Sequence, residues 1–158
     1  MKTLISSSRS AVSMSEQLVR KMQDHDIQQV ISLWLECGLP YKPEGRDSPD
    51  NIRKGMELSN DLFLVAEMDE RIVGSLLVTH DGRKGWMNRL GVLPDLRHQG
   101  VARALIEEGE RWLSEQGIGI FACIVEGHNK DSMEAMKKLG YVEFEGAKYF
   151  TKRVSNDI

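Results

Sequence analysis

The sequence predicts a single α+β domain: a mixed, mostly antiparallel sheet with helices on both faces. Three observations predict this class. Strand-like runs joined by tight turns occupy residues 62–93, amphipathic helical repeats lie before and after them, and a continuous apolar run follows at 118–125. A strand, a helix and another strand over 86–125 imply one parallel pair within the sheet.

Length and composition exclude several classes of protein. A chain of 158 residues can bury one core without disulfides or metals, and no apolar run approaches the ~20 residues of a membrane helix. A net charge of −3 argues against a surface devoted to nucleic acid. The two cysteines are distant and the histidines lack helical pairing, so we expect no metal. Since no secretory signal is evident, we expect a cytoplasmic protein without membrane or nucleic-acid partners.

The chain divides into a short extension and one domain. Residues 1–16 are rich in serine and have no sustained hydrophobic period, so we expect a flexible N-terminal extension. The domain is expected to span 17–158. It opens with a strand at 17–22, where apolar and charged residues alternate.

Two helices are expected next, separated by a loop that contains two prolines. The first is capped by Asp24 or Asp26 and ends at Gly38. The second runs from Ser48, an N-cap followed by proline, to about Leu58. The first helix carries an apolar stripe at helical spacing: Ile27, Val30, Ile31, Trp34 and Leu35.

Three strands then form an antiparallel meander. They are expected at 62–68, 71–80 and 86–93. The turns that join them are Asp69-Glu70 and Asp81-Gly82, and an Asp-Gly pair between two apolar runs is a strong hairpin signal.

Helices and strands alternate in the remaining chain. The run of eight mostly apolar residues is too short for a buried helix and is typical of a strand buried on both faces. The expected elements are a helix at 101–116, that strand at 118–125, a helix from Asn129 or Asp131 to Gly140, and two final strands at 141–145 and 147–152.

One strand-to-helix connection has the features of an anion-binding site. A strand ends at Pro94, and a short loop enters a helix at Gly100. The N-terminus of a helix attracts phosphate through free N–H groups and the helix dipole, and glycine lets the ligand approach the backbone. Residues 83–103 hold five basic residues and one acidic residue, a net +4 against −7 elsewhere, which favours a bound anion. The alternative is an ordinary polar connection.

Two motifs stand out: Val92-Leu93-Pro94 followed by Arg97-His98-Gln99-Gly100-Val101-Ala102, and Asn129 placed eleven residues before Gly140-Tyr141. In these motifs the sequence resembles the GNAT superfamily of acyl-CoA-dependent N-acetyltransferases. The order of elements agrees from about residue 18 to 153. Both motifs occur in register with the expected fold.

The resemblance implies acetyl-CoA as co-substrate, with no metal. Main-chain groups on the central strand would pair with the pantetheine arm, the N–H groups of the loop would hold the pyrophosphate, and an asparagine would bond near the pantetheine. The thioester would lie in a gap between two splayed strands. The residues so assigned are Leu90, Gly91 and Val92, then Arg97, His98, Gln99, Gly100, Val101 and Ala102, and lastly Asn129.

The sequence departs from the family at one catalytic position. Many members carry a tyrosine, acting as general acid, where this chain has Met136. A thiolate leaves easily, so the greater need is a base for the amine. The candidate catalytic residues are Glu126, His128, His80 and Asp81. Each has a structural alternative: His80 and Asp81 as part of a turn, Glu126 as the end of a strand, and His128 as an exposed side chain.

The resemblance implies an enzyme that transfers an acetyl group to a primary amine, by direct attack in a ternary complex without a cysteine nucleophile. The acceptor would be a small molecule or a peptide N-terminus. One alternative is a catalytically silent acyl-CoA-binding sensor or interaction module with the same fold, and another is transfer of a different acyl group. A monomer and a homodimer both remain open.

Overall fold

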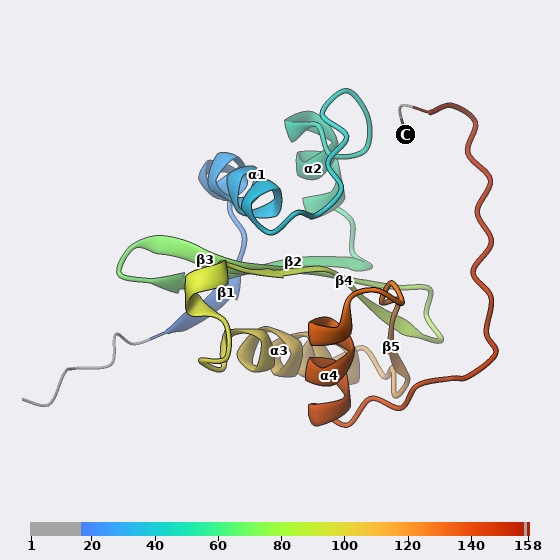
Figure 1. Ribbon diagram of the computed structural model, residues 1–158. Coiled ribbons are helices and arrows are strands. Elements are labelled where there is room, and N and C mark those ends of the chain that lie inside the picture. Colours follow the sequence, from blue (N-terminus) through green and yellow to red (C-terminus); the bar gives the residue numbers. More distant parts are fainter. Residues whose placement is uncertain (1–16, 157) are drawn as a thin grey trace, which may run out of the picture.

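The computed structural model describes residues 17–156 and 158, and in that part of the chain five strands form one sheet with two α-helices on each face (Figure 1). The expected extension, 1–16, lies outside the described residues. α1 and α2 cover one face, and α3 and α4 the other. The elements are β1 Leu18–Lys21, α1 Ile27–Glu36, α2 Pro49–Met56, β2 Asp61–Met68, β3 Arg71–His80, β4 Gly85–Val92, α3 Val101–Glu115, β5 Phe121–Cys123 and α4 Lys130–Lys138, with short 3₁₀ turns at Asp24–Asp26 and Pro94–Leu96.

The antiparallel part of the sheet confirms the predicted meander. β1 to β4 pair in sequence order, each antiparallel to the next. Asp69 and Glu70 have φ angles of 49° and 60°, as expected for a two-residue turn that matches the twist of the flanking strands.

β5 is parallel to β4, as predicted, but it is shorter and more exposed than the apolar run suggested. Pairing stops at Met87 and Cys123, after which β4 continues to Val92 without β5 beside it. The prediction of a strand at 118–125 buried on both faces is therefore wrong. The three strand residues are only half-buried, because the chain leaves the sheet once its bonds to β4 end.

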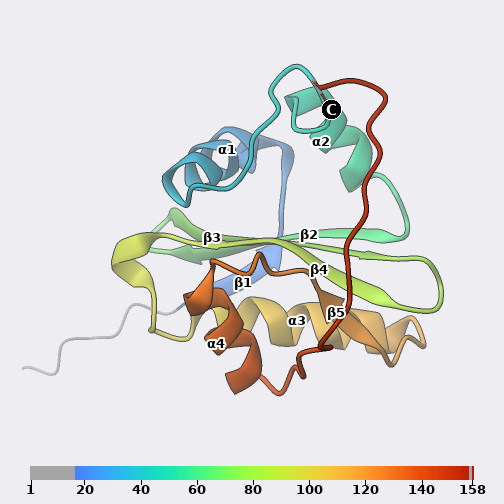
Figure 2. The same cartoon turned by 45° about the vertical axis from the view of Figure 1, so that its right-hand side comes forward.

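The two predicted final strands are also absent. Residues 141–145 and 147–152 follow α4 as extended chain outside the sheet (Figure 2). This segment passes the β5 side of the sheet and ends near α2 (Figures 1 and 2). The alternation of apolar and polar residues is typical of a strand. A strand also needs a neighbouring strand with free backbone N–H and C=O groups, and the alternation does not show whether one is present.

The core places α1 and α3 directly on the sheet. α1 buries Leu33 instead of the predicted Leu35, which is 57% exposed. The helix is turned so that Leu33 reaches β4, where its Cδ2 would lie 3.0 Å from a Cβ added to Gly91. On the other face, Gly74 lets α3 approach closely: an added Cβ would lie 2.9 Å from Val101 and 3.0 Å from Leu105.

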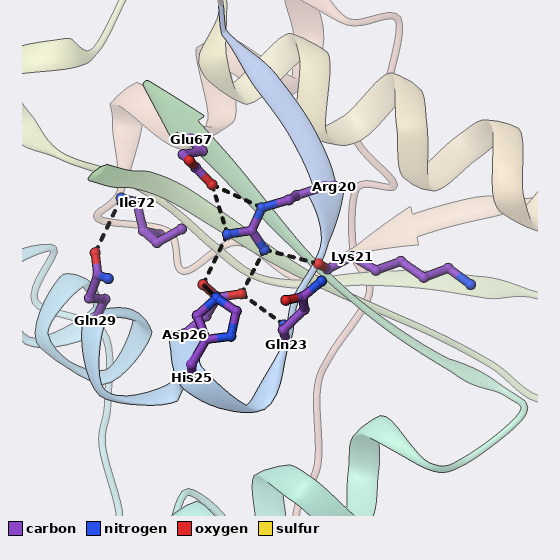
Figure 3. Close-up of polar contacts among 8 residues, drawn as sticks. All are labelled: Arg20, Lys21, Gln23, His25, Asp26, Gln29, Glu67 and Ile72. Carbon is purple, nitrogen blue, oxygen red and sulfur yellow. Dashed lines mark hydrogen bonds and ion pairs between the residues drawn. The ribbon is translucent and has the colours of Figure 1, made fainter. Parts of the chain in front are cut away.

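A buried carboxylate ties the first helical turn to the sheet (Figure 3). The side chain of Asp26 is 2% exposed and accepts hydrogen bonds from both terminal nitrogens of Arg20, at 2.7 and 3.0 Å, and from the Gln23 N–H at 2.8 Å. Arg20 also pairs with Glu67 of β2. The bond from Arg20 holds the pKa of Asp26 below its usual value, although burial opposes this.

We expect Gly74→Ala to destabilise the fold, because the new methyl group meets two buried α3 side chains and, at 3.2 Å, the carbonyl oxygen of Gly91. Overpacking of this kind costs roughly 1–3 kcal/mol in the free energy of unfolding. Urea unfolding measures it. Gly119→Ala, where nothing lies within 4 Å of the added Cβ, is the matched control and should change little.

We expect Asp26→Asn to lower the free energy of unfolding at pH 7 by about 1–3 kcal/mol, since it removes a charge-assisted pair. The pKa of Asp26 is lowered in the folded protein, so its ionised carboxylate stabilises the parent fully only above the unfolded-state pKa of about 4. The variant lacks this contribution. The difference between variant and parent should therefore shrink as the pH falls through the folded-state pKa. Asp24→Asn, at an exposed carboxylate, is the control; equal losses for both variants would contradict this account.

Candidate active site

An extra residue in β4 shapes the central strand. Ser75 of β3 pairs with Gly91 and Leu77 pairs with Asn88, so the single residue between them on β3 faces both Arg89 and Leu90. Arg89 has a φ of 55°, unusual for a residue with a side chain. This is a β-bulge, and it bends β4 at the point where its pairing with β5 has ended.

Side chains from both neighbouring elements hold the bulge. The Trp34 Nε1–H of α1 donates to the Ser75 hydroxyl at 3.0 Å, and that hydroxyl lies 3.4 Å from the Arg89 carbonyl oxygen. The Arg89 guanidinium lies over the Trp34 ring, 4.1 Å from its centroid. The backbone and the side chain of Arg89 therefore both depend on one tryptophan.

The same arginine fixes the loop 39–47. Its guanidinium forms an ion pair with Asp47 and donates to the Pro40 carbonyl oxygen at 2.5 Å. The exposed fractions of the Arg89 and Asp47 side chains are 14% and 7%. Asp47 also accepts a hydrogen bond of 2.8 Å from the Lys42 N–H. Burial lowers the pKa of Arg89, which the Asp47 charge opposes.

A cavity of about 560 Å³ opens between the bulged end of β4, the start of α3 and one side of α4. It brings together nine of the ten predicted cofactor-binding residues; only Gln99 is not part of its lining. Residues that sequence reasoning missed also line it. They are Cys37, Leu39, Leu96, Asp131, Ser132, Ala135, Lys138 and Leu139; Arg103, one of the basic residues expected to favour an anion, lines it as well. Three of the missed residues could have been found from their spacing. Ser132, Ala135 and Leu139 follow Asn129 at intervals of three and four residues, and residues so spaced share one face of a helix.

The N-terminus of α3 presents free backbone donors to this cavity. Gly100 is the N-cap residue, with a φ of 86°, and it offers no capping side chain. The first helical bond runs from the Ala104 N–H to the Gly100 carbonyl, so the N–H groups of residues 101–103 have no partner within the helix. Arg97 donates to the Val92 carbonyl at 3.2 Å, which holds the loop against β4.

α4 forms the opposite wall and begins at the predicted asparagine. The Asn129 Oδ1 accepts from the Ser132 N–H at 3.1 Å, which makes Asn129 the N-cap. Since that bond uses only the oxygen, the side-chain Nδ2 has two hydrogens available to a ligand.

The basic residues of 83–103 do not form one patch, contrary to the sequence interpretation. Arg83 and Lys84 follow β3 in the hairpin turn at the start of β4, and Arg89 is paired with Asp47. The cavity instead takes its positive charge from Arg97, Arg103 and Lys138, with Asp131 opposing them. The net charge of residues 83–103 therefore overstated the positive charge at the cavity. It also missed Lys138, which α4 contributes.

Two of the four predicted catalytic residues lie near this end of the sheet. Glu126 and His128 follow β5, and their side chains approach to 3.4 Å while remaining 73% and 80% exposed. Neither side chain belongs to the lining of the cavity, although Asn129, the residue after His128, does.

The other two lie at the far end of β4. His80 pairs with Gly85, five residues before Leu90, which corresponds to about 16 Å along a strand. Asp81 accepts hydrogen bonds from the backbone N–H groups of Lys84 and Arg83, which hold its pKa below the usual value. The His80 Nδ1 accepts from the Gly82 N–H at 3.1 Å. The structure does not bring this pair to the cavity, and their bonds serve the turn.

An apolar side chain occupies the position at which many family members carry tyrosine. Met136 is buried in the core, 5% exposed. The Tyr141 hydroxyl donates to Glu110 of α3 at 2.8 Å, and burial, reinforced by Glu110, raises its pKa. Cys37 lines the cavity, but burial raises the pKa of its thiol, which disfavours the thiolate that a nucleophile requires.

Within residues 17–156 and 158, none of the helices has the length and apolar character needed to span a membrane. In the same ranges, histidine, cysteine and acidic side chains nowhere gather in a group of three or more that could hold a metal ion.

The chain matches the model of the acetyltransferase (GNAT) family over residues 24–141. It is 34% identical over 139 residues to acetyltransferase SG1711 of Sodalis glossinidius, an alignment that covers 88% of this chain and 96% of the relative. Acetyltransferase plu1384 of Photorhabdus laumondii is also 34% identical, over 140 residues, with the same coverage. The chain therefore belongs to the GNAT acetyltransferase family and is an acyltransferase enzyme, as its motifs indicated.

Solved structures share the fold. Aminoglycoside N-acetyltransferase AAC(6')-Iy in complex with CoA superposes with a TM-score of 0.78 at 21% identity, covering 90% of this chain and 99% of that one. The PaiA N-acetyltransferase of Thermoplasma acidophilum, in complex with coenzyme A, gives 0.70 at 19% identity, covering 78% and 88%. These likenesses confirm the predicted α+β architecture.

We expect Arg89→Met to lower the free energy of unfolding by about 3–5 kcal/mol, because it leaves the Asp47 carboxylate buried without its counter-charge. The double variant Arg89→Met with Asp47→Asn should recover most of this loss, since no buried charge remains. Urea unfolding measures both variants. Arg111→Met, at an arginine whose ion pairs are more exposed, should stay close to the parent; a double variant no more stable than Arg89→Met would contradict the pairing.

Proposed function

We propose that this enzyme transfers an acetyl group from acetyl-CoA to a primary amine by direct attack in a ternary complex. The proposal rests on the cavity between β4 and α3. There, the part of β4 that no longer pairs with β5 lies next to the N-terminus of α3, which has no capping side chain. This is a site for an extended ligand that ends in phosphate, because one side offers strand-like backbone and the other offers free N–H groups.

The phosphate groups are held by the loop and the start of α3. The unpaired N–H groups of residues 101–103 form the positive end of the helix dipole and point out of the helix end. Arg97, Arg103 and Lys138 line the same cavity and add charge that favours a pyrophosphate. Gly100 leaves the approach open, since nothing lies within 4 Å of a Cβ added there.

The pantetheine arm is held by β4 and by Asn129. Leu90 and Gly91 line the cavity on a stretch of β4 that β5 does not cover. The Val92 carbonyl already accepts hydrogen bonds from Arg97 and from the Cys37 thiol, at 3.2 and 3.3 Å, which leaves the main-chain groups of Leu90 and Gly91 as the proposed partners of the arm. The Asn129 Nδ2 group supplies a donor from the opposite wall.

The chemical step needs a base more than an acid. Bound acetyl-CoA supplies an activated thioester carbonyl; a main-chain N–H near Leu90–Val92 stabilises the charge that develops on the carbonyl oxygen. Glu126, paired with His128 beyond β5, is the proposed acceptor of the amine proton, directly or through water. A thiolate is a good leaving group near neutral pH, which fits the presence of Met136 in place of tyrosine.

The acceptor is proposed to be a small cationic amine. Several neighbouring structures are named as aminoglycoside acetyltransferases, and one of them holds a bisubstrate analogue made from CoA and acetylneamine. The chain as a whole carries a net charge of −3, and a net negative charge attracts cationic molecules. Amino sugars, polyamines, amino acids and peptide N-termini form the panel to test.

The test is release of free thiol from acetyl-CoA across that panel of amines. Gly100→Trp should reduce turnover at least tenfold and weaken acetyl-CoA binding, because the indole fills the phosphate end of the cavity. Gly117→Trp is the matched control: its glycine is also left-handed, with a φ of 78°, and stands in open space at the other end of α3.

Three outcomes would overturn the proposal in different ways. Turnover that Gly100→Trp leaves intact would show that the cavity is not the donor site. Tight acetyl-CoA binding by calorimetry without turnover on any amine would favour a silent acyl-CoA-binding module. Turnover only with succinyl- or longer acyl-CoA would assign a different acyl group to the same site.

A further inference from the structure

A second cavity, of about 250 Å³, lies between α1 and the start of β3. Among the described residues, none lines both this cavity and the one proposed for acetyl-CoA. Pockets for drug-sized ligands measure roughly 300–1,000 Å³, so this one fits a smaller molecule. Its lining consists of one face of α1, the first residues of β3 and the residue that follows β4. These are Gln28, Gln29, Ser32, Leu33 and Glu36, then Arg71 and Ile72, and lastly Leu93.

The base of this cavity is apolar. Leu33, Ile72 and Leu93 are all buried in the core. The Ile72 N–H donates to the Gln29 Oε1 at 3.4 Å, which joins β3 to α1 beside the cavity (Figure 3). Because a charge placed against such a base costs free energy, the part of a ligand that lies there is apolar.

The rim of the cavity is polar and carries one charge of each sign. Arg71 and Glu36 are exposed, and within residues 17–156 and 158 neither side chain forms an ion pair. The Ser32 hydroxyl donates to the Gln28 carbonyl at 3.0 Å, so its oxygen is still able to accept a hydrogen bond. The rim therefore offers a cation, an anion and neutral hydrogen-bonding groups around an apolar base.

We propose that this cavity binds a free α-amino acid with an apolar side chain. Such a molecule has a carboxylate for Arg71, an ammonium group for Glu36 and an apolar group for the base of the cavity. A guanidinium holds a carboxylate through two parallel hydrogen bonds, which fixes the orientation of the ligand as well as its charge. The site is independent of the reaction that the enzyme catalyses.

An amino acid bound here is an effector and not the acceptor of the acetyl group. The carboxylate of Glu36 beside the ammonium group favours its charged form and so raises the pKa of the amine. A protonated amine has no lone pair with which to attack a thioester. The ligand therefore stays chemically unchanged while it is bound.

The base of the cavity also supports the end of β4. The Cδ2 of Leu33 would lie 3.0 Å from a Cβ added to Gly91. The Leu93 N–H donates to the Val73 carbonyl at 3.0 Å, which holds the chain beyond β4 against β3. A ligand on this base is therefore placed to influence the acetyl-CoA site. That consequence rests on the proposed function, whereas the binding site itself does not.

The test is a titration of the full chain with L-leucine, without acetyl-CoA, followed by calorimetry and by backbone amide resonances. We expect the resonances of Gln29, Ser32 and Ile72 to shift, together with that of Gly91. Leucinamide lacks the carboxylate and 4-methylpentanoate lacks the ammonium group. Each should bind roughly tenfold or more weakly than leucine, because it loses hydrogen bonds between charged groups.

Variants of the two charged residues assign each end of the ligand. Arg71→Met should weaken the binding of leucine but not that of leucinamide, and Glu36→Gln should weaken leucine but not 4-methylpentanoate. Ser32→Trp should abolish leucine binding, because the indole fills the cavity. Ser114→Trp is the matched control, since the Ser114 hydroxyl also donates to the carbonyl four residues earlier, at 2.7 Å, on an exposed part of α3.

Three outcomes would overturn the site: no heat and no shifts with leucine, equal affinity for the three probes, or leucine binding that Ser32→Trp leaves intact. Leucine binding that leaves Gly91 unmoved would overturn the link to β4. All of these readouts are made without acetyl-CoA, so failure here is distinct from failure of the proposed acetyl transfer.

Discussion

The contact between Arg89, Trp34 and Asp47 is the constraint on which the site depends. β4 must carry one extra residue to turn its backbone out of the regular ladder, and that residue sits at a φ of 55°. Such a conformation persists only where neighbours hold it. Here the indole lies under the guanidinium, Asp47 neutralises the guanidinium, and the Ser75 hydroxyl reaches the carbonyl.

Two further features convert this bend into a site. The parallel pairing of β4 and β5 ends at Met87 and Cys123, which uncovers the last residues of β4. The next helix then begins at Gly100 without a capping side chain, so its free N–H groups meet the uncovered strand. Core packing and ligand recognition are therefore linked, because the loop 39–47 and α1 stabilise the same bulge that the ligand would contact.

Local sequence patterns predicted much of this arrangement. The signals of Gly100 and Asn129 are local: glycine and asparagine are both favoured at the N-cap of a helix, and both residues occupy that position in the structure. The meander and the parallel strand followed from hydrophobic period and turn residues. Nine of the ten residues that the family motifs indicated line one cavity, and their contact with the cofactor stays a prediction.

What the sequence could not predict depends on contacts between distant residues. The alternation over 141–152 is the same whether the neighbouring strand belongs to this chain or to another, so it predicted strands that the single chain does not form. Lys138 could not be assigned to the cavity before the position of α4 was known. His80 and Glu126 were both candidate bases, but His80 ends β3 beside Gly85 at the start of β4, whereas Glu126 follows β5, which runs in the opposite direction to β3.

The most direct test of the central claim is a titration with acetyl-CoA followed by backbone amide resonances of the folded protein. We expect the resonances of Leu90, Gly91 and residues 101–103 to shift together, while those of the turn 81–84 do not. Shifts confined to that turn, or to the separate cavity between α1 and β3 lined by Gln28, Gln29 and Arg71, would contradict it.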